Sequence, residues 1–427
     1  MKSPAASGAK SIGVSLRSSI YLIVMLGTMV AVTFGVVGRE LVYQTLVVGV
    51  SGLVLAVALQ LARRRGGSYG LFAALTSLPL LITLSVLING FVSGNHVYLV
   101  FFVSFLMVLA LDDGDVIPRL LHATNVTYVV YLAGSVLVYA GVIDLGAGLN
   151  IFDAADRLPW LRIRTLVGLY GSTAHVDSIS LFVALLNLAC GKSGRKWMMV
   201  ILGLAASVLA VRYTPFAALA IALAVNAIMA LTRRAPQVSR GVAATATLVI
   251  ASSSFLLVGV TRMADSSDVT RALDRVTNGR TRIWSEMLDV YSGDVSAFEQ
   301  LFGTAATEEV YQVGGWPRVH PVTREVTVFW TANPHNTFLT FTLSYGLVPF
   351  LALALVLALW ATRFPAGPRG IVYFYILAVG ITNAELMTFH FPVYVAWVVV
   401  LGRRQVAERP ALAARSRRAA LPAQSPA

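Results

Sequence analysis

The sequence predicts an all-α polytopic membrane protein with about twelve transmembrane helices and one large extracytoplasmic loop. The first observation is composition, because 57% of the 427 residues are hydrophobic and only 12% are charged, whereas about a quarter of the residues in soluble domains are charged. The second is that apolar runs of about 17–25 residues recur along the chain, each able to cross a hydrocarbon core of about 30 Å. The third is that basic residues cluster in alternate connections, which is typical of cytoplasmic loops.

The apolar runs define the predicted spans and their order. Two of them are short and meet at the polar stretch "RYTP" of residues 212–215, and the last two are separated by little polar sequence. The predicted spans are 20–38, 41–62, 69–92, 97–111, 121–143, 167–190, 197–211, 215–231, 243–260, 336–361, 370–386 and 387–402.

The distribution of charge orients these spans. With both termini in the cytoplasm, the inner segments hold 21 Lys and Arg against 4 Asp and Glu, the outer segments hold 12 against 16, and together they give the net charge of +13. Basic residues stay on the cytoplasmic side of bacterial plasma (inner) membranes. The high net charge therefore follows from the membrane topology and does not indicate nucleic-acid binding. Anionic lipid headgroups are the expected partners of the basic segments.

Three regions follow from this organisation. Residues 1–18 and 403–427 are rich in Ala, Ser, Pro and Arg, a composition that predicts disordered cytoplasmic termini. Residues 19–402 form the transmembrane domain, and its first apolar run lacks a small-residue cleavage signature, so we expect an uncleaved first helix. The only cysteine, Cys190, cannot form an intrachain disulfide.

The longest connection, 261–335, is predicted to be extracytoplasmic and ordered. Apolar residues recur at helical spacing in two stretches, one starting at Asp268 and one ending at Gly293. We expect two short amphipathic helices that lie on the membrane interface or cover a cavity between the spans.

Candidate chemistry gathers on the predicted outer side. Five of the six histidines fall there, and so do four arginines at span entrances or in the long loop, namely Arg164, Arg212, Arg280 and Arg282. Guanidinium groups bind phosphate in a bidentate manner and stay charged, so an anionic substrate is expected. Asp177 is predicted to lie inside a span and needs a partner, which Arg164 or His175 could supply, either as a structural ion pair or in a direct catalytic role.

Three stretches in order along the chain carry a resemblance to a known family. They are "NGRTRIW" at 278–284, "QLFGTA" at 300–305 and "PHNTFLTFTLSYGLVPFLAL" at 334–353. The pattern Gly-Arg-x-x-x-Trp, Leu-x-Gly and His-Asn-x-x-Leu before a later Gly resembles that of the O-antigen polymerase and O-antigen ligase superfamily. The resemblance covers about 164–360, and it departs from the family pattern at Val211, before Arg212, and at Ala305.

The resemblance implies transfer of a glycan from an undecaprenyl-pyrophosphate-linked donor to an acceptor glycan on the outer leaflet. The transfer would be inverting and would need no metal or other cofactor. His335 would be the base, and Arg280 and Arg212 would grip the pyrophosphate. Asn336 would orient His335 or the acceptor, or else cap the following helix. The residues expected to bind substrate are Arg282, Asn336, Arg164, Tyr170, His175 and Asp177.

Polymerase and ligase share these motifs, and we favour a polymerase of capsule or exopolysaccharide assembly, with a flippase and a chain-length regulator as partners. Ligase-type transfer to a different acceptor is the alternative. A metal-dependent glycosyltransferase would need acidic residues in the first outer loop, where only Glu40 is present beside Arg39. The acidic "DDGD" at 112–115 is interpreted as a solvated helix end rather than a metal site. A transporter or flippase of lipid-linked glycans is the alternative from another class.

Overall fold

The computed structural model describes residues 19–30, 53, 105, 108–109, 112, 116–143, 166, 173–191, 194–210, 213–263, 268, 271–273, 277, 279–304, 310–319, 326–331, 334–382 and 393–403. Apart from a few positions, the predicted spans 41–62, 69–92 and 97–111 lie outside these residues, and so do the terminal segments 1–18 and 404–427.

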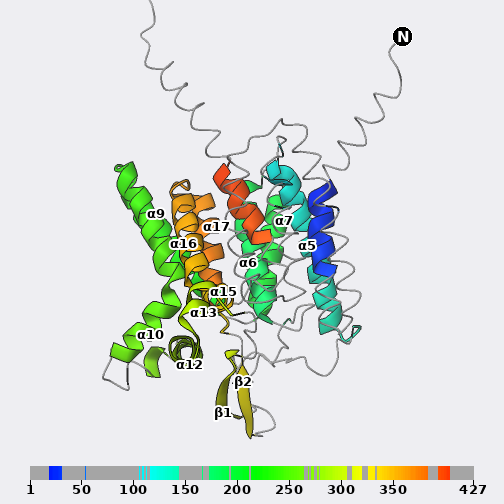
Figure 1. Cartoon of the computed structure of the whole chain (residues 1–427). Coiled ribbons are helices and arrows are strands. Elements are labelled where there is room, and N and C mark those ends of the chain that lie inside the picture. The colour runs from blue at the N-terminus through cyan, green and yellow to red at the C-terminus, as the bar shows by residue number, and fades with distance from the viewer. Residues whose placement is uncertain are drawn as a thin grey trace, which may run out of the picture.

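The described chain is mostly helical (Figure 1). Long helices form a bundle, and a group of short elements lies at one end of it, which we call the loop end. The bundle helices are α5 (Val116–Tyr139), α6 (Thr173–Cys190), α7 (Arg195–Leu209), α8 (Thr214–Leu231), α9 (Pro236–Ala251), α16 (Leu347–Ala361) and α17 (Pro368–Thr382). The loop-end elements are α10 (Ser253–Met263), α12 (Arg280–Gly293), α13 (Ala297–Phe302), β1 (Val313–Val319), β2 (Val326–Thr331) and α15 (Thr337–Tyr345).

Several described helices have the length and apolar character of membrane spans. By these two criteria, α5 and α8 qualify alone, and α9 together with α10 qualifies as a bent pair. Shorter apolar helices are found at 19–30, in α6, α16 and α17, and at 393–403. The helices α7 and α8 are separate, as the short runs 197–211 and 215–231 predict, and Pro215 lies in the first turn of α8, where its missing N–H costs no helical hydrogen bond.

Two predicted spans are interrupted, and this corrects the sequence-based prediction. The run 243–260 is divided between α9 and α10, which meet at Ser252 with a bend of 67°. Serine side chains compete for backbone hydrogen bonds and favour helix ends, and Ser252 lies within the run "ASSS". The run 336–361 is divided between α15 and α16 by Gly346, whose φ of 87° ends the first helix.

The loop between the spans contains a β-hairpin as well as helices. The second predicted helical stripe corresponds to α12, which ends at Gly293 as expected. However, β1 and β2 pair as antiparallel strands with a bulge between Gly314 and Trp316, so the prediction of an entirely helical loop was wrong. The signal was present in "VTVFWT" at 326–331, because β-branched and aromatic residues favour strands.

Two hydrophobic cores organise the molecule. The larger one fills the helix bundle. The smaller one, here called the loop core, lies at the loop end and consists of Val258, Ile283, Trp284, Met287, Val295, Tyr311, Val313, Leu339 and Leu343. Phe255 and Ile381 pack against both cores. The loop-end elements are therefore attached to the bundle by continuous apolar packing.

The first residue of "DDGD" is not solvated, contrary to the interpretation above. Asp112 is buried, and its Oδ2 accepts a hydrogen bond of 2.7 Å from the Tyr21 hydroxyl and lies 2.9 Å from Nη2 of Arg119. Arg403 also donates to the nearby carbonyl oxygen of Leu109. Asp112 therefore joins the first helix to the start of α5 through a buried ion pair, and residues 113–115 lie outside the described part of the chain.

Candidate functional site

One hydrogen bond links the Arg-x-x-x-Trp stretch to the Pro-His-Asn stretch. The indole Nε1–H of Trp284, on α12, donates to the carbonyl oxygen of Pro334 at 2.7 Å, and Trp284 is almost completely buried in the loop core. Arg280 precedes Trp284 by four residues at the first position of α12 and is half-buried. Residues four apart share one helix face, so Arg280 lies on the face of α12 that packs against the segment around His335.

His335 occupies an unusual backbone conformation. Its φ is 51°, and among the described residues other than glycine no other residue has a positive φ. Such left-handed conformations cost an L-residue roughly 1–2 kcal/mol. The flanking residues hold it there, because Pro334 is bound by Trp284 and Asn336 is fixed by the helix that follows. Local strain of this kind is often found at functional sites, and it makes the half-buried imidazole the leading candidate for chemistry in this region.

Asn336 caps α15, the second of the two roles expected for it. Its Oδ1 accepts a hydrogen bond of 2.9 Å from the Leu339 N–H, and its carbonyl oxygen accepts one of 2.8 Å from the Thr340 hydroxyl. Within the described residues, the buried Nδ2 of Asn336 has no hydrogen-bond partner. The amide oxygen of Asn336 is therefore bonded to the helix, and its amide nitrogen, next to His335, is available to donate a hydrogen bond.

The second stretch, "QLFGTA", meets the end of α15 in the third stretch through two glycines. A Cβ on Gly303 would overlap backbone atoms of Ser344 and Tyr345, and a Cβ on Gly346 would overlap the backbone of Leu301 and Phe302. Both glycines have positive φ, 86° and 87°. Glycine is required at both positions because the two backbones cross in direct contact, and this crossing joins the second and third stretches of the motif.

Arg282 lies on a different face of α12 from Arg280. Its side chain is exposed and its Nε lies 3.3 Å from Oε1 of Glu286, one turn further along the helix. Two positions apart on a helix do not share a face. The structure therefore separates the two arginines that the sequence analysis grouped as phosphate ligands, and Arg280 is the one on the side of His335.

Asp177 lies in the interior of the bundle, on α6. Its Oδ1 accepts a hydrogen bond of 3.1 Å from the Ser178 hydroxyl, and its carbonyl oxygen accepts one of 3.3 Å from Ser207 on α7. The Tyr375 hydroxyl of α17 donates to the carbonyl oxygen of Ser178 at 2.9 Å. Asp177 is thus embedded in a polar contact between three helices, and the side chains of its two predicted partners, Arg164 and His175, lie outside the described part of the chain.

Four other predicted site residues are not described to the level of their side chains. Arg212, Arg164 and Tyr170 lie outside the described residues, and for His175 only its place in the first turn of α6 is given. The described part of the site therefore consists of Arg280, Trp284, His335 and Asn336, supported by the glycine crossing.

Two tyrosines of the loop end were not singled out by the sequence analysis. Tyr311 is buried in the loop core, and the Tyr291 hydroxyl donates to the carbonyl oxygen of Gln300. Burial raises the pKa of both phenols above the ordinary value. Both therefore stay neutral near neutral pH, where they can donate hydrogen bonds but cannot serve as bases. Tyr291 belongs to the apolar stripe that predicts the helix ending at Gly293, and neither tyrosine lies in one of the three motif stretches.

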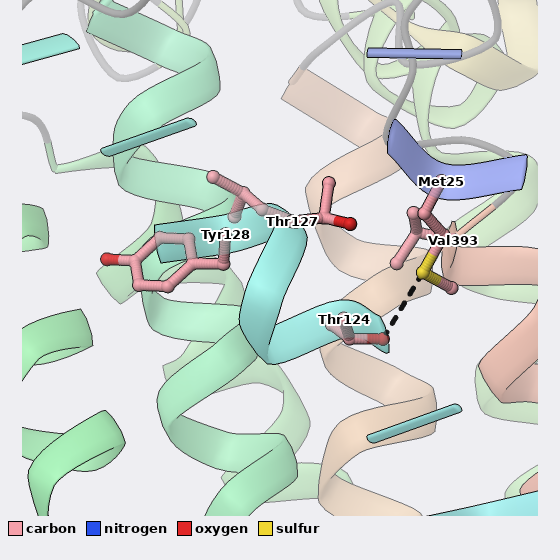
Figure 2. A pocket seen from close by; sticks show the side chains of 6 residues that line it. Met25, Thr124, Thr127, Tyr128 and Val393 are labelled. Atoms are coloured by element: carbon pink, nitrogen blue, oxygen red, sulfur yellow. Dashed lines mark hydrogen bonds between the residues drawn. The ribbon is translucent and has the colours of Figure 1, made fainter. Parts of the chain in front are cut away.

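A small cavity inside the bundle is separate from this region (Figure 2). It is lined by Met25, Thr124, Thr127, Tyr128, Ile179 and Val393. The Thr124 hydroxyl contacts Sδ of Met25 at 3.6 Å and accepts a hydrogen bond of 2.9 Å from the Trp397 indole. The cavity lining is apolar apart from hydroxyl groups and holds none of the predicted site residues.

The described side chains do not include a group of three or more His, Cys, Asp and Glu residues placed to hold a metal ion. The groups nearest the segment around His335 are the His335 imidazole, the buried amide nitrogen of Asn336, and Arg280, which lies one helical turn from Trp284 on α12. This set can accept a proton from a hydroxyl group and stabilise developing negative charge on a phosphate.

No protein-family model matches the sequence, and comparisons with curated proteins and with solved structures give no significant match either.

Proposed function

We propose that this protein is a metal-independent glycosyltransferase of the bacterial plasma membrane that polymerises glycans carried on undecaprenyl pyrophosphate. In this proposal about twelve helices cross the membrane, both termini are cytoplasmic and the loop end faces outward. The observation that supports it best is the convergence of three stretches of one motif, joined by the Trp284–Pro334 hydrogen bond and by the crossing of Gly303 and Gly346.

The proposed reaction uses the groups that meet at the loop end. The acceptor hydroxyl oxygen attacks the anomeric carbon of the donor glycan while the bond from that carbon to the pyrophosphate oxygen breaks. The His335 imidazole takes the hydroxyl proton, because imidazole is the side chain best suited to accept and release a proton near neutral pH. Arg280, half-buried at the start of α12, stabilises the negative charge that develops on the leaving pyrophosphate.

The test separates the base from the pyrophosphate ligand. In nanodiscs, His335→Ala should reduce single-turnover transfer by about 10²–10⁴-fold while leaving the affinity for a lipid-pyrophosphate donor nearly unchanged. Arg280→Ala should weaken both donor binding and transfer, and Arg280→Lys should restore them only in part because lysine lacks the planar fork. Arg282→Ala is the matched control, since Arg282 is exposed and paired with Glu286, and it should retain transfer. Near-normal transfer by His335→Ala would exclude this mechanism.

Two further experiments distinguish the competing classes. Transfer should survive excess EDTA, whereas loss of activity that magnesium or manganese restores would favour the metal-dependent class. In cells that lack the protein, single glycan repeats should accumulate on the outer leaflet. Accumulation on the inner leaflet would favour a flippase. Accumulation of long, already polymerised chains that remain on the lipid carrier would favour ligase-type transfer to a different acceptor.

The predicted sidedness is tested with an impermeant thiol reagent on intact cells. In a Cys190→Ser background, a cysteine at Ser292, which is exposed on α12, should be labelled, and a cysteine at Ser416 in the tail should not. The reverse pattern would contradict the proposed orientation.

A further inference from the structure

The bend at Ser252 directs α10 away from the axis of α9 and leaves it with two apolar faces. Its inner face packs Val258 into the loop core against α12. Its outer face presents Leu256, Val260 and Met263, which are 51%, 50% and 85% exposed. Their spacing of four and three residues places them in one stripe. A helix in contact with water on its outer side would be expected to carry polar residues there.

The short helix α13 shows the same feature in a second place. Phe298 and Leu301 are exposed and lie three residues apart, so they share one face of the helix. The polar side chains of α13 are directed back toward its start, where Ser296 and Glu299 form a reciprocal capping box and the Gln300 amide donates to the carbonyl oxygen of Val295. Loop-end helices thus carry exposed apolar stripes at two separate points.

Both stripes lie on elements that are attached to apolar bundle helices. The helix α13 packs against α16, which exposes Leu351, Leu355 and Leu359 at a spacing of four residues. The helix α10 follows directly from α9, which exposes Leu248 and Val249. In an apolar helix bundle, exposed leucine stripes of this kind are the surface that contacts lipid chains. The two loop-end stripes lie on elements that directly follow or pack against those helices.

The charged residues of the same elements lie elsewhere. At the end of α10, Arg262 turns toward α12, where its guanidinium pairs with the carboxylate of Asp289 and donates to the carbonyl oxygen of Ser285. On α12, the exposed side chains are polar or charged, including Arg282, Asp289 and Ser292. The loop end therefore has an apolar rim formed by α10 and α13 and a polar surface formed by α12, with the hairpin projecting beyond them (Figure 1).

We propose that α10 and α13 lie in the surface of the lipid bilayer at the loop end, with Leu256, Val260, Met263, Phe298 and Leu301 inserted among the lipid chains. The occupant of both stripes is lipid, because amphipathic helices bury their apolar face at the boundary between headgroups and acyl chains and because contiguous exposed apolar patches mark such contacts. The two helices hold the loop core and His335 at this boundary. The inference does not depend on the proposed enzymatic activity.

The test measures what surrounds each side chain in the assembled protein. Single cysteines are placed at Val260, Met263 and Phe298 in a Cys190→Ser background, labelled with a nitroxide and reconstituted in nanodiscs of phosphatidylethanolamine and phosphatidylglycerol. Collision rates with oxygen, which concentrates in lipid, and with a water-soluble nickel chelate are then compared by electron paramagnetic resonance. Leu355 on α16 serves as the lipid-facing control and Ser292 on α12 as the water-facing control, both exposed.

Labels at Val260, Met263 and Phe298 should resemble the label at Leu355, with oxygen favoured over the nickel chelate, and should differ from the label at Ser292. If these labels resemble Ser292 instead, α10 and α13 face water and the proposal is wrong. If both reagents are excluded, the stripes are covered by protein, such as a second copy of the chain, and the proposal is equally wrong. All the labelled positions are exposed, and Met263, the most exposed of them, provides a readout even if one of the other variants folds poorly.

Discussion

The indole nitrogen of Trp284 donates a hydrogen bond to the carbonyl oxygen of Pro334 across a sequence separation of 50 residues. This bond fixes the residue directly before His335 to the buried face of α12, one turn from Arg280. Because Pro334 and Trp284 are both buried, water cannot replace the bond. The position of the strained His335 is therefore determined by α12 as much as by α15, the helix that follows it.

Trp284→Phe should loosen this attachment while keeping the aromatic packing. The substitution leaves the buried Pro334 carbonyl oxygen without its donor, which typically costs about 1–3 kcal/mol. We expect faster backbone hydrogen exchange around Asn336–Leu339 and a lower midpoint of thermal unfolding, measured on the purified protein in the same detergent. Tyr291→Phe is a suitable control, because it also removes a donor to a carbonyl oxygen in this region but should not affect exchange at 336–339. Unchanged exchange in Trp284→Phe would mean that the hydrogen bond does not hold the segment.

His335→Gly should separate backbone strain from side-chain chemistry. Glycine accepts a φ of 51° without the penalty of roughly 1–2 kcal/mol that an L-residue pays there. The thermal unfolding midpoint of His335→Gly should therefore lie at or above that of His335→Ala, while both variants lose transfer to the same extent because both lack the imidazole. Calorimetry and single-turnover transfer assays would be run on both proteins. A His335→Gly variant that is clearly less stable than His335→Ala would show that the left-handed backbone is not strained.

Gly303→Ala should disrupt the crossing between α13 and α15. The new methyl group would overlap the Ser344 carbonyl oxygen, and the φ of 86° would become strained. Overpacking alone typically costs about 1–3 kcal/mol, so we expect a large fall in the unfolding midpoint and in transfer. Gly293→Ala is the matched control, since a Cβ there meets nothing within 4 Å, and it should be neutral or slightly stabilising. Equal midpoints for the two variants would argue against a direct backbone contact at Gly303.

Asp112→Ala should destabilise the bundle by leaving Arg119 and Tyr21 without their shared carboxylate. Removing one partner of a buried ion pair typically costs about 3–5 kcal/mol, a loss that thermal unfolding in detergent would detect. Asp268→Ala offers a direct comparison, because its pair with Arg271 is exposed on both sides and exposed pairs contribute about 0–1 kcal/mol. If both substitutions lower the midpoint equally, the ion pair of Asp112 is as accessible to water as the exposed pair of Asp268.

The sequence by itself predicted the mostly helical, apolar character of the chain and the bounds of several of its described helices. Apolar composition and period predicted separate helices on either side of residues 212–215 and a helix that ends at Gly293, because hydrophobic period and helix-ending residues are local properties. The motif stretches drew attention to Arg280, His335 and Asn336 for the same reason, since each is a short run of neighbouring residues. Signals of this kind depend only on residues that are close together in the sequence.

Tertiary structure alone decided the contacts between distant segments, and hydropathy did not show where two of the helices break. The bend at Ser252 and the division at Gly346 fall inside apolar runs that hydropathy treats as continuous. Gly346 is a glycine because the backbone of Leu301 and Phe302 crosses there, a fact that no local pattern contains. Likewise Asp112 is buried because Tyr21 and Arg119 surround it, and Arg280 and Arg282 separate because packing of Trp284 selects one face of α12. Each of these depends on which distant surface excludes water, and that is settled only when the helices pack together.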